Sequence, residues 1–392
     1  NCREVIVVDI RKPNWNDSLI NVISSIAKAF GTKSNYQTNA LVDQVLAKDY
    51  KNIVLLLLDG LGDENLQELS PHGILINHKK AVISSTFPST TVAATTTIES
   101  GVSPLEHGWL GWSLYFKEID RNIDIFPYRD SITKELIPLT DFDAKDVLKY
   151  ETIYQKMSRT TKDEAMFYAF HPDKISHQAE GCTNIEYSDI QNMFDKMKEV
   201  CAQEGKKYIY AYSANPDYDM HEFGSRADEV QKDVLDIETK LEAFVEEVKD
   251  TVIIAIADHG HIDIDWIYLA EIPGMKECLA KFPTVESRAK NIALVKGKEE
   301  QFRQLYHQYL AQDFLLLSKE TILKEHYFGY GTKHDKFDDF IDDYMLVAIG
   351  NKALGFESPK EGEFNMKSTH AGLTAREMLV PLIIIEKKGE RK

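Results

Sequence analysis

Cysteine is scarce in this sequence, and the few cysteines lie far apart. The 392 residues contain four, at positions 2, 182, 201 and 278, with no Cys-x-x-Cys pair. Disulfide frameworks and cysteine-rich zinc sites need more numerous or more closely spaced cysteines. We therefore expect reduced thiols, as in a cytosolic protein.

The sequence also lacks an excess of positive charge and any long apolar run. Lys and Arg number 46 against 63 Asp and Glu, a formal net charge of −17. Long nucleic acids require a basic surface, and a membrane span requires about 18–20 consecutive apolar residues. The longest apolar runs here are 53–58 and 252–257, and residues 1–12 do not form a signal peptide. We expect a cytoplasmic protein that binds neither long nucleic acid nor a membrane.

Short apolar segments alternate with amphipathic ones along most of the chain. Strands are predicted at 53–58, 81–85, 166–170, 207–212, 252–257 and 378–385, and helices at 17–30, 90–99, 190–200 and 230–244. This alternation predicts an α/β fold with a doubly wound, mostly parallel sheet between helix layers. Between 263 and 365 the pattern loosens. We expect a catalytic core of 1–262 and 366–392, with 263–365 as a small inserted α+β subdomain that forms a lid and determines specificity.

Acids and histidines follow three of the predicted strands. Asp59 follows 53–58, Asp217 and His221 follow 207–212, and Asp258 and His259 follow 252–257. Singly, each has an ordinary explanation as a turn, a cap or an exposed helical pair. Parallel strands, however, deliver them to one edge of the sheet, where clustered acids are unfavourable unless cations bind. Asp and His together favour zinc or manganese over magnesium.

A hydroxyl-rich segment, 84–91, precedes the helix predicted at 90–99. A hydroxyl at a helix N-terminus faces free backbone N–H groups, where a phosphate also binds. A metal ion would lower the pKa of this hydroxyl and make it a nucleophile. Ordinary N-capping by Ser or Thr is the structural alternative.

These motifs together resemble those of a known family. Phe87-Pro-Ser-Thr-Thr91, followed by Gly101, Pro104 and Glu106-His-Gly108, is similar to the nucleophile segment of the alkaline phosphatase superfamily, in its type I phosphodiesterase/nucleotide pyrophosphatase branch. The other matching motifs, in chain order, are Leu58-Asp-Gly60, Pro216-Asp217-x-x-x-His221, Asp258-His-Gly260 and Thr369-His370.

The resemblance implies an alkaline-phosphatase-like fold with Thr91 as the nucleophile and two divalent ions, usually Zn²⁺, with Mn²⁺ as an alternative. It places one ion with Asp59, Thr91, Asp258 and His259. It places the other ion with Asp217, His221 and His370. The branch usually has an Asn three residues after the nucleophile, whereas this chain has Ala94. Another group, such as Thr90, would then have to bind the phosphoryl oxygen.

The activity that the resemblance implies is hydrolysis of phosphoric diester or pyrophosphate bonds in small, nucleotide-like substrates, through a phospho-threonine intermediate. A phosphomonoesterase or phosphomutase on the same core, and a catalytically silent nucleotide- or metal-binding homologue, remain alternatives. Diesters are expected over monoesters, because the segments expected to line the site contain no Arg and only Lys367.

Aromatic residues follow the nucleophile segment. Trp109, Trp112 and Tyr115 are candidates for stacking against a nucleobase, although packing in the core is the commoner role of such side chains. The sequence leaves the oligomeric state open.

Overall fold

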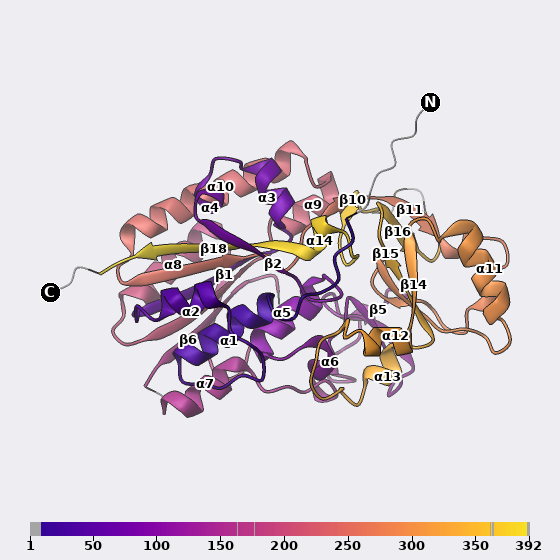
Figure 1. Cartoon of the computed structure of the whole chain (residues 1–392), viewed down its shortest axis with the longest axis horizontal. Helices are drawn as coiled ribbons and strands as arrows, with labels where there is room; N and C mark the ends of the chain where they lie inside the picture. The colour runs from indigo at the N-terminus through magenta and orange to yellow at the C-terminus, as the bar shows by residue number, and fades with distance from the viewer. Residues whose placement is uncertain (1–8, 163, 176, 361, 363, 390–392) are drawn as a thin grey trace.

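Two seven-stranded sheets organise the chain, and they lie at opposite ends of an elongated molecule (Figure 1). The computed structural model describes residues 9–162, 164–175, 177–360, 362 and 364–389. The sheet with the longer strands is called the central sheet here. Its first strand in the chain, β1 (Asn52–Leu58), has a parallel neighbour on each side.

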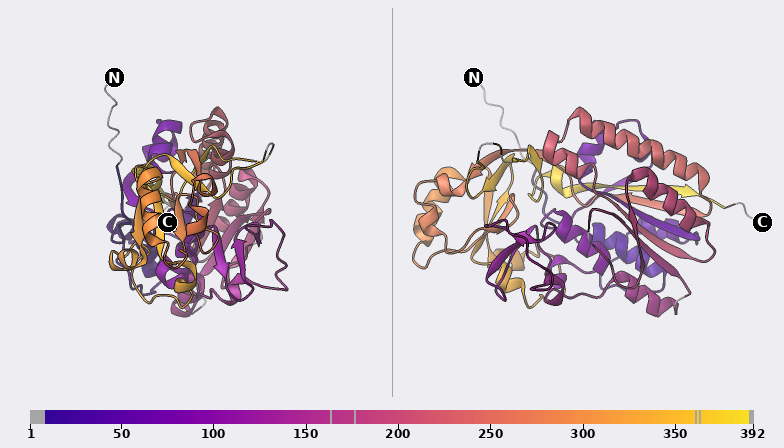
Figure 2. Two further views of the ribbon diagram at one scale, coloured as in Figure 1. Left: turned by 90° about the vertical axis from the view of Figure 1, so that its right-hand side faces the viewer. Right: turned by 180° about the vertical axis from the view of Figure 1, so that it is seen from behind.

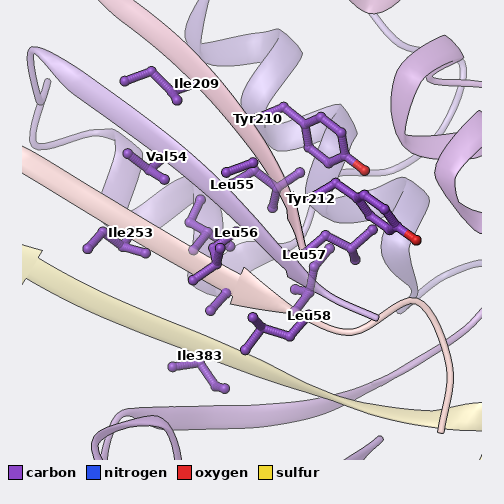
Figure 3. Packing of buried hydrophobic residues seen from close by; sticks show 14 of the residues in the cluster. Val54, Leu55, Leu56, Leu57, Leu58, Ile209, Tyr210, Tyr212, Ile253 and Ile383 are labelled. Carbon is purple, nitrogen blue, oxygen red and sulfur yellow. The ribbon is translucent and has the colours of Figure 1, made fainter. Parts of the chain in front are cut away.

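The central sheet has the order β2-β18-β9-β1-β8-β6-β7, and within it only β18 runs antiparallel to its neighbours. Its strands are β1 (Asn52–Leu58), β2 (Lys79–Ser84), β6 (Met166–Pro172), β7 (Thr183–Tyr187), β8 (Lys207–Ser213), β9 (Thr251–Ile256) and β18 (Leu379–Lys387). Every residue of β1, β8 and β9 is buried, because helices cover both faces. Figure 3 shows the β1 side chains packed among those of neighbouring strands, such as Ile209 and Ile253.

Helices cover both faces of this sheet (Figures 1 and 2). One layer contains α3 (Asp63–Leu69), α4 (Ile74–Asn77), α8 (Ile190–Ala202) and α10 (Asp228–Glu247). The other contains α1 (Leu19–Ala29), α2 (Ala40–Leu46), α5 (Thr91–Ser100) and α7 (Ile153–Thr161). Shorter helices at the edges are α6 (Pro104–His107), α9 (Asp217–Phe223) and α14 (Ala375–Met378). This arrangement confirms the predicted doubly wound, mostly parallel fold.

The second sheet has the order β14-β15-β13-β12-β3-β4-β5 and is antiparallel. Its strands are β3 (Ser113–Phe116), β4 (Arg121–Asp124), β5 (Arg129–Asp130), β12 (Thr284–Val285), β13 (Ala289–Ile292), β14 (Phe314–Ser318) and β15 (Tyr344–Ala348). Beside them are α11 (Glu299–Tyr309), α12 (Lys319–Lys324) and α13 (Phe337–Phe340). The strands β3–β5 thus come from a segment that the sequence analysis assigned to the core. The boundaries predicted at 262/263 and 365/366 stay a prediction.

The second sheet is buried on two sides, as β15 illustrates. Met345 and Val347 face the hydrophobic cluster that contains Phe87, the first residue of the predicted nucleophile segment. Leu346, which alternates with them, faces the cluster that contains Phe302 of α11. One face of the second sheet therefore packs against the part of the molecule that contains Phe87, and its other face packs against α11.

The segment 263–365 leaves and re-enters the core at neighbouring points. Strands β10 (Ile262–Asp263) and β17 (Ser368–Thr369) pair antiparallel, with Ile262 opposite Thr369. Next to them, β11 (Asp265–Tyr268) pairs parallel with β16 (Lys352–Gly355). The two ends of the segment are therefore close together in space. In the sequence, the segment lies between Asp258 and His370, two of the predicted metal ligands.

Two expectations about composition concern particular residues. Cys182, Cys201 and Cys278 are free thiols, whereas Cys2 lies outside the described residues. Across the described ranges, no helix combines the length and the apolar character that crossing a membrane requires. Residues 1–8, most of the segment considered for a signal peptide, also lie outside the described ranges.

Candidate active site

The ends of three parallel strands bring the predicted site residues together. Asp59 follows β1, Asp258 and His259 follow β9, and Asp217 begins α9 after β8. The backbone carbonyl of Asp59 accepts a hydrogen bond from the Asp217 N–H at 3.0 Å, so two of these strand ends are joined directly. Asp and His side chains meet there in two groups.

The first group consists of Asp59, Asp258 and His259, and the second of Asp217, His221, His261 and His370; within each group the ligand atoms lie within 4.8 Å of one another. The rings of His259 and His370 stack with centroids 3.7 Å apart, so the two groups are in contact. The predicted division of ligands into two neighbouring sets thus corresponds to two clusters in the structure. The role of each residue stays a prediction.

Thr91, the predicted nucleophile, lies in the first group. Its Oγ1 is 3.3 and 3.4 Å from the two carboxylate oxygens of Asp59 and 3.2 Å from His259 Nε2. As the first residue of α5, it stands where the free N–H groups of the helix begin. The hydroxyl therefore has predicted metal-ligand atoms on one side and the positive end of a helix dipole on the other.

Asp258 shows that a cation fits the first group. Its Oδ1 accepts the N–H groups of Gly60 and His259, each at 3.0 Å. Its Oδ2 is buried and has no hydrogen-bond partner among the described residues. A buried carboxylate oxygen without a donor is costly, and a bound cation would remove that cost.

The charge on Asp59 leads to the same conclusion. Burial, together with the neighbouring charges of Asp258 and Asp217, raises the pKa of Asp59 well above its usual range. The Tyr212 hydroxyl donates to Asp59 Oδ2 at 2.5 Å, which offsets part of this effect. Like charges this close repel one another, and divalent ions would neutralise them.

In three histidines, Nδ1 lies near a backbone carbonyl, which leaves Nε2 as the nitrogen that could bind a metal ion. Nδ1 of His221 lies 2.9 Å from the Ser368 carbonyl, and Nδ1 of His370 lies 3.0 Å from the Ser89 carbonyl. Nδ1 of His259 lies 3.3 Å from the Gly260 carbonyl.

Because a carbonyl only accepts, each Nδ1 carries the proton and each Nε2 keeps a lone pair. Burial also lowers the pKa of His370 well below its usual range, which keeps this imidazole neutral, as a ligand must be.

His261 belongs to the second group, although the sequence analysis did not include it. Its Nε2 lies 2.5 Å from Asp217 Oδ1, and its Nδ1 lies 2.6 Å from Ser368 Oγ. Gly60, at φ +76°, makes room for the ring, because a Cβ there would lie 2.9 Å from His261 Cδ2. The sequence could have indicated His261 through its position two residues after His259. It was not included because the motif matched to the family ends at Gly260.

The structure places the four proposed substrate contacts differently from one another. Trp109 packs in a hydrophobic cluster and donates from its indole N–H to the Leu148 carbonyl at 2.9 Å. The Tyr115 hydroxyl donates to Asp120 at 2.7 Å. Trp112 is partly exposed and contacts Phe126 edge to face. Whether any of them binds substrate stays a prediction.

Thr90, the fourth proposed contact, bonds to a residue that the sequence analysis missed. Its hydroxyl donates to Glu286 Oε1 at 2.6 Å, and the Trp112 backbone N–H donates to the same oxygen at 2.7 Å. Glu286 lies in the loosely patterned segment after 263, where no motif marked it. Burial raises its pKa above the usual value.

The arginines near the site are all engaged with carboxylates. Arg226 and Arg376 each bond to Glu68 at 2.9 Å, and Arg288 bonds to Glu377 at 2.7 Å. The guanidinium of Arg226, for example, is paired with Glu68 through both Nε and an Nη atom.

A doubly wound sheet, with Asp and His at its strand ends and a hydroxyl at a helix start, defines an alkaline-phosphatase-like hydrolase. A sequence model of the family "Type I phosphodiesterase / nucleotide pyrophosphatase" matches residues 53–330. The chain belongs to this family, as the motifs predicted, and is a hydrolase that acts on phosphoric ester or pyrophosphate bonds. Members of the family use divalent metal ions.

Solved structures show the same fold at low sequence identity. Human ectonucleotide pyrophosphatase/phosphodiesterase 5 is 14% identical with a TM-score of 0.63, over 86% of this chain and 87% of that one. An inactive murine form in complex with AMP is 13% identical with a TM-score of 0.60, over 86% and 87%. Phosphonoacetate hydrolase from Sinorhizobium meliloti 1021, in complex with phosphonoacetate, is 16% identical with a TM-score of 0.61, over 88% and 92%. A comparison with curated protein sequences gave no significant match.

Proposed function

We propose that this chain is a metal-dependent hydrolase of phosphoric diester or pyrophosphate bonds in small, nucleotide-like substrates, with Thr91 as its nucleophile. The observation that carries the proposal is the position of Thr91 Oγ1, within 3.4 Å of both Asp59 and His259. Phosphoryl transfer depends mainly on positioning and charge stabilisation, and this site offers both. The ligands reported in related structures, AMP and phosphonoacetate, are consistent with a small anionic substrate.

The two clusters would hold two ions. Asp59, Asp258 and His259 would bind one together with Thr91, and the residues that would bind the other are Asp217, His221 and His370. Oxygen and imidazole donors in this mixture favour Zn²⁺, with Mn²⁺ as the alternative. When bound, such ions lower the pKa of a coordinated hydroxyl and balance the charge of the transferred phosphoryl group.

The chain's own residues set the course of the reaction. Thr91 releases its hydroxyl proton to water and attacks phosphorus in line with the leaving group, so an Oγ1–P bond forms as the bond from phosphorus to the leaving oxygen breaks and that oxygen takes up a proton from water. The first N–H groups of α5 stabilise the negative charge of the phosphoryl oxygens. Water then cleaves the threonine ester and restores the hydroxyl of Thr91.

The proposed preference for diesters follows from the cations around the site. A monoester dianion needs a positive partner beyond the metals, and arginine usually provides it. Arg226, Arg288 and Arg376 are paired with carboxylates instead. One observation favours a phosphomonoesterase or phosphomutase: Ala94, fully buried in α5, takes the place of the diesterase Asn. The cytoplasmic location remains part of the proposal.

A substrate screen tests the function. Metal-loaded protein, with Zn²⁺ or Mn²⁺ added, is assayed against nitrophenyl phosphate monoesters and diesters and against nucleotide pyrophosphates. We expect turnover of diesters or pyrophosphates. A monoester favoured by about tenfold or more, roughly 1.4 kcal/mol, would reverse the assignment to the monoesterase. Protein that holds metal but hydrolyses nothing would instead be the silent homologue.

A further inference from the structure

Glu286 places a carboxylate from the second sheet beside Thr90, at the start of α5. It directly follows β12 and accepts hydrogen bonds from the Thr90 hydroxyl at 2.6 Å and the Trp112 N–H at 2.7 Å. Thr90 is the N-cap of α5, and Thr91 is the next residue. The side chain is 8% exposed, so its charge acts in a poorly solvated space.

The backbone around Glu286 is shaped to hold it there. Val285 has φ +74°, a left-handed conformation that a β-branched residue rarely adopts. Gly111 packs against it so closely that a Cβ would lie 2.9 Å from Val285 Cγ1 and 3.1 Å from the Val285 carbonyl. Such strained conformations persist where surrounding contacts impose them, and they cluster at functional sites.

Glu286 also acts weakly on one histidine of each cluster. Its carboxylate is a minor contributor to the raised pKa of His221, and His259 slightly offsets the rise that burial causes in the pKa of Glu286. A phosphoryl group attacked by Thr91 would lie at the start of α5, next to Thr90, which is hydrogen-bonded to this carboxylate. Both hydrogen bonds to Glu286 end on Oε1, and none from the described part of the chain reaches Oε2.

One cation offsets part of this charge. Lys290, opposite Val285 in the β12–β13 pair, interacts electrostatically with Glu286. It is partly buried and also interacts with Asp124. The second sheet thus carries one negative and one positive charge close to each other.

We propose that Glu286 determines the substrate class by repelling phosphoryl groups that carry two negative charges, so that diester monoanions are preferred. The inference rests on the proposed hydrolase function and names the residue that sets its selectivity. Thr90 and Trp112 fix the carboxylate in position, and Lys290 limits its effect.

The test compares Glu286→Gln with the wild type in metal-loaded form. The amide keeps an oxygen that accepts from Thr90 and Trp112, so the positioning contacts remain while the charge is lost. We expect kcat/KM for 4-nitrophenyl phosphate to rise about tenfold, and kcat/KM for bis(4-nitrophenyl) phosphate to change less than about threefold. Glu277→Gln, at an exposed glutamate of the same inserted segment, is the matched control and should leave the ratio unchanged.

Binding of inorganic phosphate gives a readout that needs no turnover. In calorimetric titrations, Glu286→Gln should bind phosphate about tenfold more tightly than the wild type does, because one negative charge is gone. Lys290→Gln should shift phosphate affinity and monoester kcat/KM the opposite way, by about threefold or more. These opposite signs separate a charge effect from a loss of structure.

The outcomes are distinguishable. If Glu286→Gln keeps its melting temperature and metal content but changes neither the ester ratio nor phosphate affinity, the inference is wrong. If the wild type hydrolyses neither ester, the proposed function fails, and the phosphate titration still decides the role of Glu286. If Glu286→Gln does not fold, Lys290→Gln decides it: unchanged phosphate affinity in that variant overturns the inference.

Discussion

The central sheet and the second sheet contribute differently to the site. The central sheet has long, fully buried strands, and Asp59 directly follows β1 while Asp258 lies two residues after the end of β9. The second sheet has short strands, two of only two residues, and brings the single carboxylate of Glu286 to Thr90. Ligands at the ends of buried strands are held rigidly, as metal binding requires, whereas a neighbouring sheet can vary without disturbing them. In the proposed account, the central sheet therefore carries the chemistry, and the second sheet carries the selectivity.

Removing metal should have the largest effect. If the acids of the central sheet act only with bound cations, a chelator should abolish turnover, and added Zn²⁺ or Mn²⁺ should restore it. The measurement is the initial rate on a nitrophenyl diester before and after dialysis against chelator. Full activity in protein shown to be metal-free would break the assignment of the chemistry to this sheet.

Separate variants should remove the two ions separately. Asp59→Asn should weaken the ion of the first cluster, and Asp217→Asn that of the second, since each loses a charged ligand. We expect about two ions per chain in the wild type and about one in each variant, by elemental analysis. Asp236→Asn, at an exposed position on α10, should keep both. Loss of both ions in either variant would mean that the clusters form one inseparable centre.

Two core truncations sharpen the comparison of the sheets. Leu56→Ala in β1 and Leu346→Ala in β15 each remove a fully buried side chain, and each should lower the free energy of unfolding by about 2–5 kcal/mol. Only Leu56 lies on a strand that leads to a metal ligand, so only Leu56→Ala should also weaken metal binding. Denaturant unfolding and metal titration measure the two effects. Equal loss of metal affinity in both variants would contradict the division.

His261 should have the smallest effect of the four. It contacts Asp217, a predicted ligand of the second ion, so His261→Gln should weaken the binding of that ion by about tenfold and leave the first unchanged. Competition with a metal indicator reads both affinities. An unchanged second ion would make His261 a packing residue. Loss of binding as complete as in Asp217→Asn would make it a direct ligand.

Much of the central sheet could be predicted from the sequence, because strands buried on both faces appear as continuous apolar runs. Residues 53–58 and 252–257 are such runs, and they correspond to β1 and β9. The residue after each run was then placed at one edge of a parallel sheet. The same reasoning located the segment that holds Asp217, whereas Thr91 was identified through the resemblance of residues 87–91 to the family.

The full extent of the second sheet could not be predicted, for a physical reason. Strands as short as β5 and β12 carry no detectable periodicity, and β3 joins the sheet by pairing with β12, which lies far away in the sequence, with Val285 opposite Ser113. Glu286 becomes recognisable only through its bond to Thr90, which depends on the left-handed conformation of Val285. His261 was missed because its contact with Asp217 depends on the space above Gly60.

The most direct test of the account is turnover of a nitrophenyl diester by Thr91→Ala, with bound metal measured on the same preparation. Thr90→Ala, the adjacent hydroxyl, is the matched variant. The account predicts that Thr91→Ala keeps most of its metal and its melting temperature but loses turnover, because one attacking oxygen is gone, whereas Thr90→Ala loses far less. Normal turnover by metal-loaded Thr91→Ala would contradict it, because water would then attack phosphorus directly.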